Sequence, residues 1–265
     1  LKKISKYAGE RFDLVQAGGG NSSVKLENGE MLIKASGFSL SDVTEHQGFS
    51  TVKTKEIAQI VDQDQVLSEP DKRAREKLTA SLVGEATIDK SNRPSIETLL
   101  HTLLHKYTLH THPVIANALL NQPDWKSILG EIFEGDDIAY VGYYTPGIDL
   151  AIALKKEIDQ FIAIPKIIFL QNHGVIVSSE SYNRIFDLKE YVIGKIEKYL
   201  EVNFDRYKMT TAISKLFNQL EESDNITYLT EDVTILEGIK QKMASYLKTP
   251  FCPDSLVYCG FTAVV

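Results

Sequence analysis

Apolar and polar positions along the chain alternate between strand-like and helix-like spacing. Residues 166–170 form a continuous apolar run typical of a buried strand, and residues 175–177 carry on as a strand after His173 interrupts it. Apolar residues at helical spacing over 183–207 predict a long amphipathic helix. Further helices are predicted over residues 2–9, 54–61, 69–82, 114–120, 148–161, 212–222 and 235–247, and further strands over 24–26, 31–34, 107–109, 137–140 and 255–258.

An N-terminal hairpin is predicted beside a glycine-rich loop. Val24–Leu26 and Met31–Lys34 flank an Asn-Gly turn, which favours two antiparallel strands. The hairpin follows Gly18–Ser23 and runs into Ala35–Gly37, two turns of small residues that can converge at one end of the sheet. Backbone N–H groups in such turns can bind an anion, although for the glycine loop taken alone a flexible tight turn is the favoured explanation. Because no helix follows the loop, it is neither a Walker loop nor a dinucleotide fingerprint.

His110 and His112 are separated by one residue on a predicted strand that Pro113 ends. Side chains at i and i+2 of a strand point to the same face, so the two imidazoles project together. They supply half of a tetrahedral zinc site, or else they are two half-exposed strand histidines. His173 interrupts a buried apolar stretch, where its ring nitrogens need partners. It is either a hydrogen-bonded core histidine or a third metal ligand.

A further helix is predicted to begin at Ser95, a plausible cap, and to carry the four leucines of residues 99–104 as an apolar stripe. Glu97 would lie in its first turn, where a carboxylate suits the helix dipole without any chemical role. His101 and His105 are four residues apart and could mimic a metal pair. We interpret them as packing or surface histidines.

Composition narrows the class of protein. The 265 residues are 43% hydrophobic and 25% charged, which is typical of one large globular domain or slightly more. A net charge of -7 argues against a nucleic-acid-binding surface. The two cysteines, Cys252 and Cys259, are too few for a disulfide framework. With no signal peptide and no apolar run long enough to cross a bilayer, we expect a cytoplasmic protein without membrane partners. The first residue, Leu1, and the ending suggest part of a longer chain.

Six short motifs follow one another along the chain: Gly20-Asn21-Ser22-Ser23, Ser36-Gly37, Pro94-Ser95-Ile96-Glu97, His110-Thr111-His112, Tyr143-Tyr144-Thr145-Pro146-Gly147 and Asn172-His173-Gly174. Their order resembles that of the class II aldolase/adducin superfamily, whose best-known members are fuculose- and rhamnulose-phosphate aldolases. The resemblance covers roughly residues 3–205, and the combination is far more specific than any single motif.

The resemblance implies an α/β fold with three layers, α/β/α, around a largely antiparallel central sheet. This aldolase-like domain is expected over residues 1–205. Residues 206–265 are expected to form a helical C-terminal extension that ends in a strand. That extension looks like the segment that links aldolase to dehydrogenase in longer fused relatives.

The resemblance also implies roles for individual residues. His110, His112 and His173 match the ligands of Zn²⁺ or another divalent metal, and Glu97 matches the acid/base residue. Tyr143 matches a tyrosine that acts as proton donor in a neighbouring subunit's site. Positions that match the substrate-phosphate site are Gly20, Asn21, Ser36, Gly37 and Ser95.

The chain departs from the fuculose-phosphate aldolase pattern at two places. Ile96 stands where the family pattern has a second serine, and Lys34-Ala35 stands where it has Thr-Pro. The loss of a hydroxyl donor at Ile96 predicts a reshaped anion pocket. Lys34 would restore a positive charge to that pocket if its side chain turns inward, but without the geometry of a hydroxyl.

From these residues we expect a metal-dependent aldolase that cleaves a small ketose phosphate or related hydroxy-carbonyl compound. Retro-aldol cleavage leaves an enediolate, whose charge a divalent cation stabilises as a Lewis acid. The alternatives within the superfamily are a pentose-phosphate 4-epimerase and a sugar-phosphate dehydratase. A non-catalytic adducin-like interaction module is a further alternative, although such a module is expected to lack part of the histidine set. The resemblance also implies a homo-oligomer, expected to be a tetramer.

Overall fold

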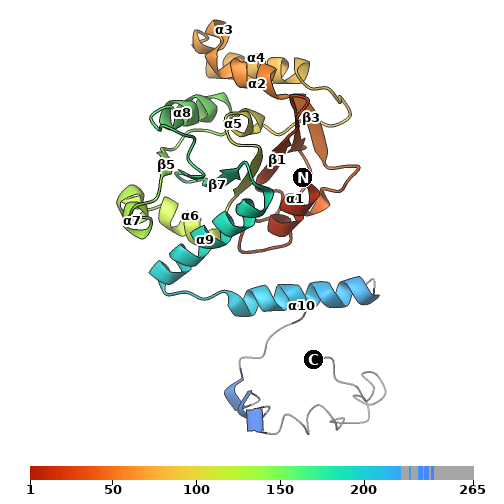
Figure 1. Ribbon diagram of the computed structural model, residues 1–265, viewed down its shortest axis with the longest axis vertical. Helices are drawn as coiled ribbons and strands as arrows, with labels where there is room; N and C mark the ends of the chain where they lie inside the picture. The colour runs from red at the N-terminus through yellow and green to blue at the C-terminus, as the bar shows by residue number, and fades with distance from the viewer. Residues whose placement is uncertain (222–226, 228–231, 235, 239, 242–265) are drawn as a thin grey trace. The chain divides into compact units, whose positions relative to one another are not determined.

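The computed structural model describes residues 1–221, 227, 232–234, 236–238 and 240–241 (Figure 1). The chain divides into two units, Leu1–Phe204 and Asp205–Val265. In the second unit, helix α10 spans Asp205–Glu221. The predicted strand at 255–258 lies outside the described residues, as does most of the predicted helix at 235–247.

A seven-stranded sheet forms the centre of the first unit, in the order β3-β2-β1-β4-β7-β6-β5. Every neighbouring pair is antiparallel except β5 and β6, which are parallel. The predicted, largely antiparallel sheet is therefore confirmed. The strands are β1 (Asn21–Lys25), β2 (Glu30–Lys34), β3 (Phe49–Lys53), β4 (Tyr107–Thr111), β5 (Ile138–Val141), β6 (Ile167–Leu170) and β7 (Gly174–Ser179).

Helices cover both faces of this sheet, which confirms the three-layer α/β/α architecture (Figure 1). Strand β6 shows why: Phe169 packs into one apolar cluster, while its neighbour Ile168 packs into the other, because successive side chains of a strand alternate. One layer contains α1 (Lys2–Gly9), α6 (Val114–Leu120), α7 (Trp125–Ile132) and α9 (Tyr182–Leu200). The other contains α2 (Thr54–Gln59), α3 (Asp64–Leu67), α4 (Lys72–Glu85), α5 (Thr98–Thr102) and α8 (Ile148–Ile158). The 3₁₀ turns are η1 (Leu40–Asp42) and η2 (Ile60–Asp62). Among the helices that the structure describes, none has the length and apolar character needed to span a bilayer.

Several predicted helices have different bounds in the structure, among them those predicted over 54–61, 69–82 and 148–161, which are α2, α4 and α8. Two further differences follow from the backbone. The helix expected from Ser95 is the short α5, which begins only at Thr98, because the preceding segment is tied to the β2–β3 connection. Pro94 forms an isolated bridge with Ala35 there, so the backbone is extended and cannot yet be helical. The long helix expected to reach residue 207 ends at Leu200, because Glu201 adopts left-handed backbone angles that terminate it.

Candidate metal centre

His110 and His112 come from the end of β4, the middle strand of the sheet. His110 lies opposite Asn21 of β1 and Ile176 of β7, and its side chain is fully buried. His112 follows the strand, and its backbone N–H donates a hydrogen bond to the carbonyl of Leu14 at 2.9 Å. The two ring centroids are 4.9 Å apart, so the predicted projection of both imidazoles toward one site is confirmed.

His173 reaches the same place from the turn between β6 and β7. The expectation that it interrupts a buried strand is wrong, because residues 171–173 connect two separate antiparallel strands. Asn172 adopts φ 53 in this turn, a conformation that asparagine tolerates better than most residues. The turn brings the His173 ring to 4.8 Å from that of His110 and 5.1 Å from that of His112, measured between centroids.

Two glycines allow the backbone to approach these rings. A Cβ at Gly174 would overlap the carbonyl oxygen of Thr111 and lie 2.8 Å from Cδ2 of His112. Gly20 has a φ of +77, and a Cβ there would lie 2.9 Å from the carbonyl oxygen of His110. Both positions therefore need glycine for the strands and loops to close around the histidines.

The three histidines have the donor set of a metal site. Their ligand atoms lie within 4.8 Å of one another. The Nε2 atoms of His110 and His112 and the Nδ1 atom of His173 are buried, with no hydrogen-bond partner among the described residues. Buried polar atoms without partners are costly, and convergent imidazole lone pairs suit a divalent cation such as zinc. Burial also lowers the pKa of His110, and it lowers the pKa of His112 to about 3, which favours the neutral imidazole that metal ligation requires.

Glu97 lies directly beside the histidines, just before α5. One carboxylate oxygen is 3.0 Å from Nδ1 of His110, and the other is 3.1 Å from Nε2 of His173. Burial by itself raises the pKa of Glu97, but the charge interaction and hydrogen bonds with the two histidines outweigh it and hold the pKa well below its usual value. Glu97 is therefore an ionised carboxylate at neutral pH, with the capacity to accept a proton.

Lys34 and Asn21 provide polar groups near this carboxylate. Lys34 is only 5% exposed, and its ammonium donates to the carbonyl of Phe38 at 2.7 Å. Burial lowers the pKa of Lys34, while Glu97 and Asp42 act to raise it. Asn21 is buried and its Oδ1 accepts a hydrogen bond from a backbone N–H, but its Nδ2 has no partner within the described part of the chain. Lys34 thus turns inward, and Asn21 has a free donor.

The other predicted anion-binding residues lie on two loops that run side by side. The backbone N–H of Ser36 donates to the carbonyl of Arg93 at 2.8 Å. Ser95 Oγ accepts a hydrogen bond from the backbone N–H of Glu97, so this serine adjoins the carboxylate. Gly37 has a φ of +87, which a turn at this position requires. In the glycine loop, the N–H of Gly19 already donates to the carbonyl of Gln16 and is not available to an anion.

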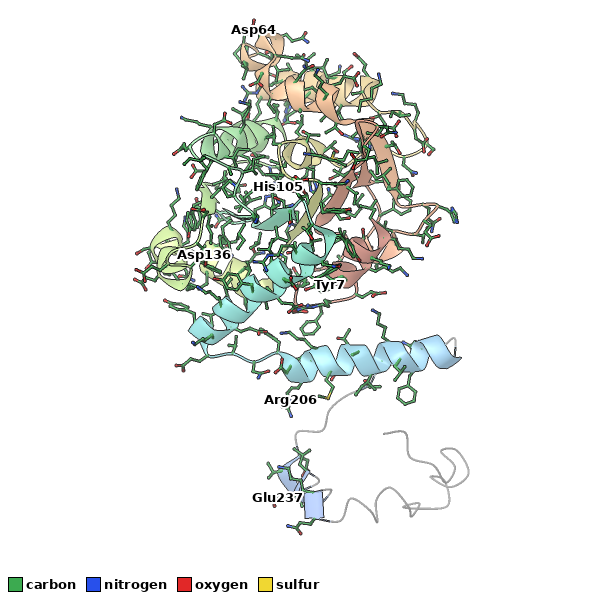
Figure 2. The ribbon with its side chains drawn as sticks, viewed as in Figure 1. Tyr7, Asp64, His105, Asp136, Arg206 and Glu237 are labelled. Carbon is green, nitrogen blue, oxygen red and sulfur yellow. The ribbon has the colours of Figure 1, made fainter. Side chains whose placement is uncertain are left out.

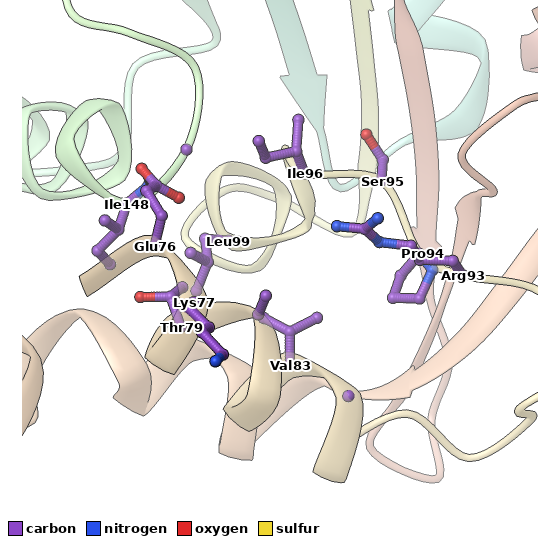
Figure 3. A pocket seen from close by; sticks show the side chains of 13 residues that line it. Glu76, Lys77, Thr79, Val83, Arg93, Pro94, Ser95, Ile96, Leu99 and Ile148 are labelled. Carbon is purple, nitrogen blue, oxygen red and sulfur yellow. The ribbon is translucent and has the colours of Figure 1, made fainter. Parts of the chain in front are cut away.

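A cavity of about 320 Å³ opens beside Ser95 and Ile96 (Figure 3). Ile96 is 56% exposed, and the cavity wall continues onto α4 and α8 through Val83 and Ile148. Figure 3 shows the guanidinium of Arg93 extending between Ile96 and Val83. No local pattern in the sequence indicates this cavity, because its walls come from three separate segments, residues 76–84, 93–99 and 147–148.

Three further candidates lie outside the cluster. His101 is buried, and its Nδ1 is 2.7 Å from Oγ of Ser23. His105, labelled in Figure 2, contacts Glu180 and the carbonyl of Ile164. Both histidines therefore have packing roles. Tyr143 is 57% exposed in the loop between β5 and α8.

The protein-family model described as the Class II Aldolase and Adducin N-terminal domain matches residues 3–199 of this chain. The chain therefore belongs to this family, whose aldolases include enzymes that act on sugar phosphates with a divalent metal. The histidine cluster is a group that could hold such an ion.

Solved structures of low sequence identity share the fold. The N-terminal class II aldolase domain of a conserved protein from Thermoplasma acidophilum is 22% identical, with a TM-score of 0.63 over 75% of this chain and 91% of that one. A sugar-phosphate aldolase from Thermotoga maritima is 14% identical, with a TM-score of 0.55 over 76% of this chain and 91% of that one. An L-fuculose 1-phosphate aldolase is 18% identical, with a TM-score of 0.51 over 91% and 94% of the two chains.

A curated relative in Bacillus subtilis (strain 168), the uncharacterized oxidoreductase YuxG, is 27% identical over 204 residues. The match covers 72% of this chain but only 28% of that protein. The chain thus spans less than a third of this longer relative.

Proposed function

We propose that this chain is a divalent-metal-dependent aldolase that cleaves a small ketose phosphate or a related hydroxy-carbonyl compound by a retro-aldol reaction. The observation that carries the proposal is a cluster of three histidines beside the carboxylate of Glu97. Each histidine has one buried ring nitrogen without a hydrogen-bond partner among the described residues. Zinc is the ion that this donor set suits best, since neutral imidazoles leave it a full charge and open positions for substrate.

His110, His112 and His173 would hold the metal, which supplies Lewis-acid stabilisation of the enediolate left when the carbon–carbon bond breaks. The substrate's β-hydroxyl loses its proton as the bond breaks and the aldehyde forms. Glu97, whose carboxylate is ionised next to the proposed metal ligands, would accept that proton and then deliver it to the enediolate carbon. Tyr143 is proposed as a proton donor to the site of a neighbouring subunit, a role that its exposure permits.

The anionic end of the substrate is proposed to bind between Asn21 and the two adjoining loops. The free Nδ2 of Asn21 and the hydroxyls of Ser36 and Ser95 would donate to it, with Gly20 and Gly37 providing close approach of the backbone. The buried ammonium of Lys34, which donates to the carbonyl of Phe38, would add a positive charge. Ile96 stands where the fuculose-phosphate aldolase pattern has a serine, so one hydroxyl donor is missing. The Ile96 side chain lines the neighbouring cavity instead.

We further propose a cytoplasmic homotetramer, which rests on family resemblance and on the exposed Tyr143. A stable and active monomer in light scattering would contradict the tetramer.

The test combines metal analysis with a cleavage screen over ketose 1-phosphates, followed by NMR of the products. We expect one divalent ion per chain and an aldehyde product from at least one substrate. A pentose-phosphate 4-epimerase would instead interconvert two ketose phosphates without net cleavage, and a dehydratase would release water. Stoichiometric metal in a variant with all three histidines replaced by alanine would contradict the site itself.

A further inference from the structure

Thr111 lies between the two strand histidines but points to the opposite face of the sheet. It is fully buried, and its Oγ1 accepts a hydrogen bond from the ammonium of Lys189 at 2.6 Å. Lys189 belongs to α9, the helix that packs against β4 and β7, and it is fully buried as well. A buried lysine therefore contacts the strand directly behind His110 and His112.

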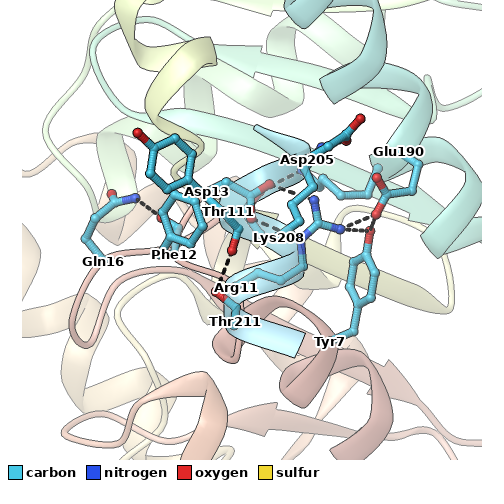
Figure 4. A network of polar contacts seen from close by, with 12 residues as sticks. Tyr7, Arg11, Phe12, Asp13, Gln16, Thr111, Glu190, Asp205, Lys208 and Thr211 are labelled. Carbon is cyan, nitrogen blue, oxygen red and sulfur yellow. Dashed lines mark hydrogen bonds and ion pairs between the residues drawn. The ribbon is translucent and has the colours of Figure 1, made fainter. Parts of the chain in front are cut away.

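The surroundings of Lys189 are charged. Burial lowers the pKa of Lys189 to about 7, and Arg11 acts in the same direction, while Glu190 and Asp13 act to raise it. Arg11 in turn forms an ion pair with Asp13 at 2.6 Å. The carboxylate of Glu190 pairs with Arg11 and also accepts a hydrogen bond from the hydroxyl of Tyr7 (Figure 4). An amine donates a hydrogen bond in its charged and its neutral form, so the contact with Thr111 does not depend on the protonation state.

The end of β4 is thus held at three neighbouring points. Lys189 holds the side chain of Thr111, the carbonyl of Leu14 accepts from the N–H of His112, and the carbonyl of Asp13 accepts from the N–H of Val114. Asp13, fixed by Arg11, belongs to the same charged group as Lys189. The polar network on the α9 side of the sheet therefore converges on the residues that present two of the proposed metal ligands.

Burying an ammonium is expensive, and a methionine of similar length would fill the same space without that cost. This cost indicates that the hydrogen bond from Lys189 to Thr111 has a role that an apolar side chain cannot take. Metal sites need their ligand atoms held to within a few tenths of an ångström, and groups behind the ligands commonly set that geometry.

We propose that Lys189 is a positioning residue for the metal centre: through its hydrogen bond to Thr111 it fixes the end of β4, and thereby the separation of His110 and His112. The proposal rests on the proposed metal site. It predicts that loss of this hydrogen bond weakens metal binding beyond any effect on folding.

The experiment is a Co²⁺ titration of the full chain, followed by the visible absorption of the bound ion, with circular dichroism as a check of folding. Lys189→Met removes the donor, and Thr111→Val removes the acceptor while keeping the shape. We expect each to raise the Co²⁺ dissociation constant about tenfold, the lower end of the range for groups behind metal ligands, and to alter the cobalt spectrum. The double variant should lose no more than either single one, because all three break the same contact.

Two controls separate positioning from general stability. Thr111→Ser keeps the hydroxyl and should bind Co²⁺ like the unchanged protein. Ser5→Ala removes another buried contact between a helix and the sheet, the 2.7 Å pair of Ser5 and Ser22, and should leave the dissociation constant within about twofold.

An unchanged dissociation constant and spectrum in folded Lys189→Met overturns the positioning role while leaving the metal site intact. Losses that multiply in the double variant also overturn it, since they would mean two independent effects. If Lys189→Met does not fold, Thr111→Val decides by the same criteria. A chain that binds no Co²⁺ before any substitution overturns the proposed metal centre and the positioning role together.

Discussion

The histidine cluster and the Ser95–Ile96 segment are neighbours in the structure, yet they are constrained very differently. His110 is fully buried between two strands, whereas Ile96 is 56% exposed at the edge of a cavity. Only one residue, Glu97, follows Ile96 before α5 begins, and its carboxylate contacts the cluster. Two adjoining parts of one candidate site thus differ in how much the surrounding fold dictates their side chains.

The reason lies in the contacts. Around the cluster, a side chain at Gly174 or Gly20 would collide with β4, and Glu97 occupies ring nitrogens of two histidines. The Ser95–Ile96 segment is held mainly through its backbone, for example by the bridge of Pro94 with Ala35. Side chains held only through the backbone can change without disturbing the fold. On the proposed function, the buried cluster would carry the reaction chemistry and the open segment would set substrate preference.

The largest effect is expected at the buried cluster. His110→Ala removes a proposed ligand and should abolish stoichiometric metal binding, and activity with it, while the protein remains folded. Metal analysis and circular dichroism check this outcome. His105→Ala is the matched control, because His105 lies outside the cluster and contacts Glu180 and Ile164 instead. Equal metal loss in both variants would contradict the assignment of ligands.

The next largest effect should arise at Glu97. Glu97→Gln keeps the shape and much of the hydrogen bonding but cannot accept a proton, so turnover should fall about 10²–10⁴-fold with metal retained. Steady-state kinetics on a verified substrate measure this loss, and Glu180→Gln serves as a carboxylate control. Near-normal turnover would leave Glu97 as a partner of the histidines without a catalytic part.

Smaller and opposite effects are expected at two residues of the proposed anion pocket, the buried Lys34 and the exposed Ile96. Lys34→Ala should raise KM about tenfold for a phosphorylated substrate and change it little for the unphosphorylated analogue, since a charged hydrogen bond contributes about 1.5–3 kcal/mol. Ile96→Ser restores a hydroxyl and should lower KM for the phosphorylated substrate by a few-fold. Matched kinetics on the two substrates decide the matter: equal changes on both would exclude Lys34 from anion binding.

The last effect concerns stability and not activity, and it extends the comparison to a buried histidine outside the cluster. Burial lowers the pKa of His101 to about 3 from an ordinary value near 6.5. The unfolded chain binds more protons than the folded one between these values, so stability falls as pH decreases from about 6.5 toward 3. For one histidine the slope is at most about 1.4 kcal/mol per pH unit. Urea unfolding of His101→Gln should show a shallower decline, and an unchanged pH profile would contradict the assignment of this slope to His101.

Local features of the sequence determined much of this protein. The two-residue period of a strand placed His110 and His112 on one face, and the Asn-Gly turn predicted the β1–β2 hairpin. The ordered motifs indicated the family and, with it, the three layers and the largely antiparallel sheet. Each of these inferences depends on neighbouring residues or on the order of motifs, which a sequence displays directly.

Only the tertiary structure decided what meets across the sheet. It placed His173 in a turn beside the strand histidines, turned Lys34 inward, shortened the helix after Glu97, and set Lys189 behind Thr111. Lys189 and Thr111 are 78 positions apart, and no local pattern links them. Such contacts depend on strand order and on helix packing, which are settled by how all the apolar faces are buried together and not by any one segment.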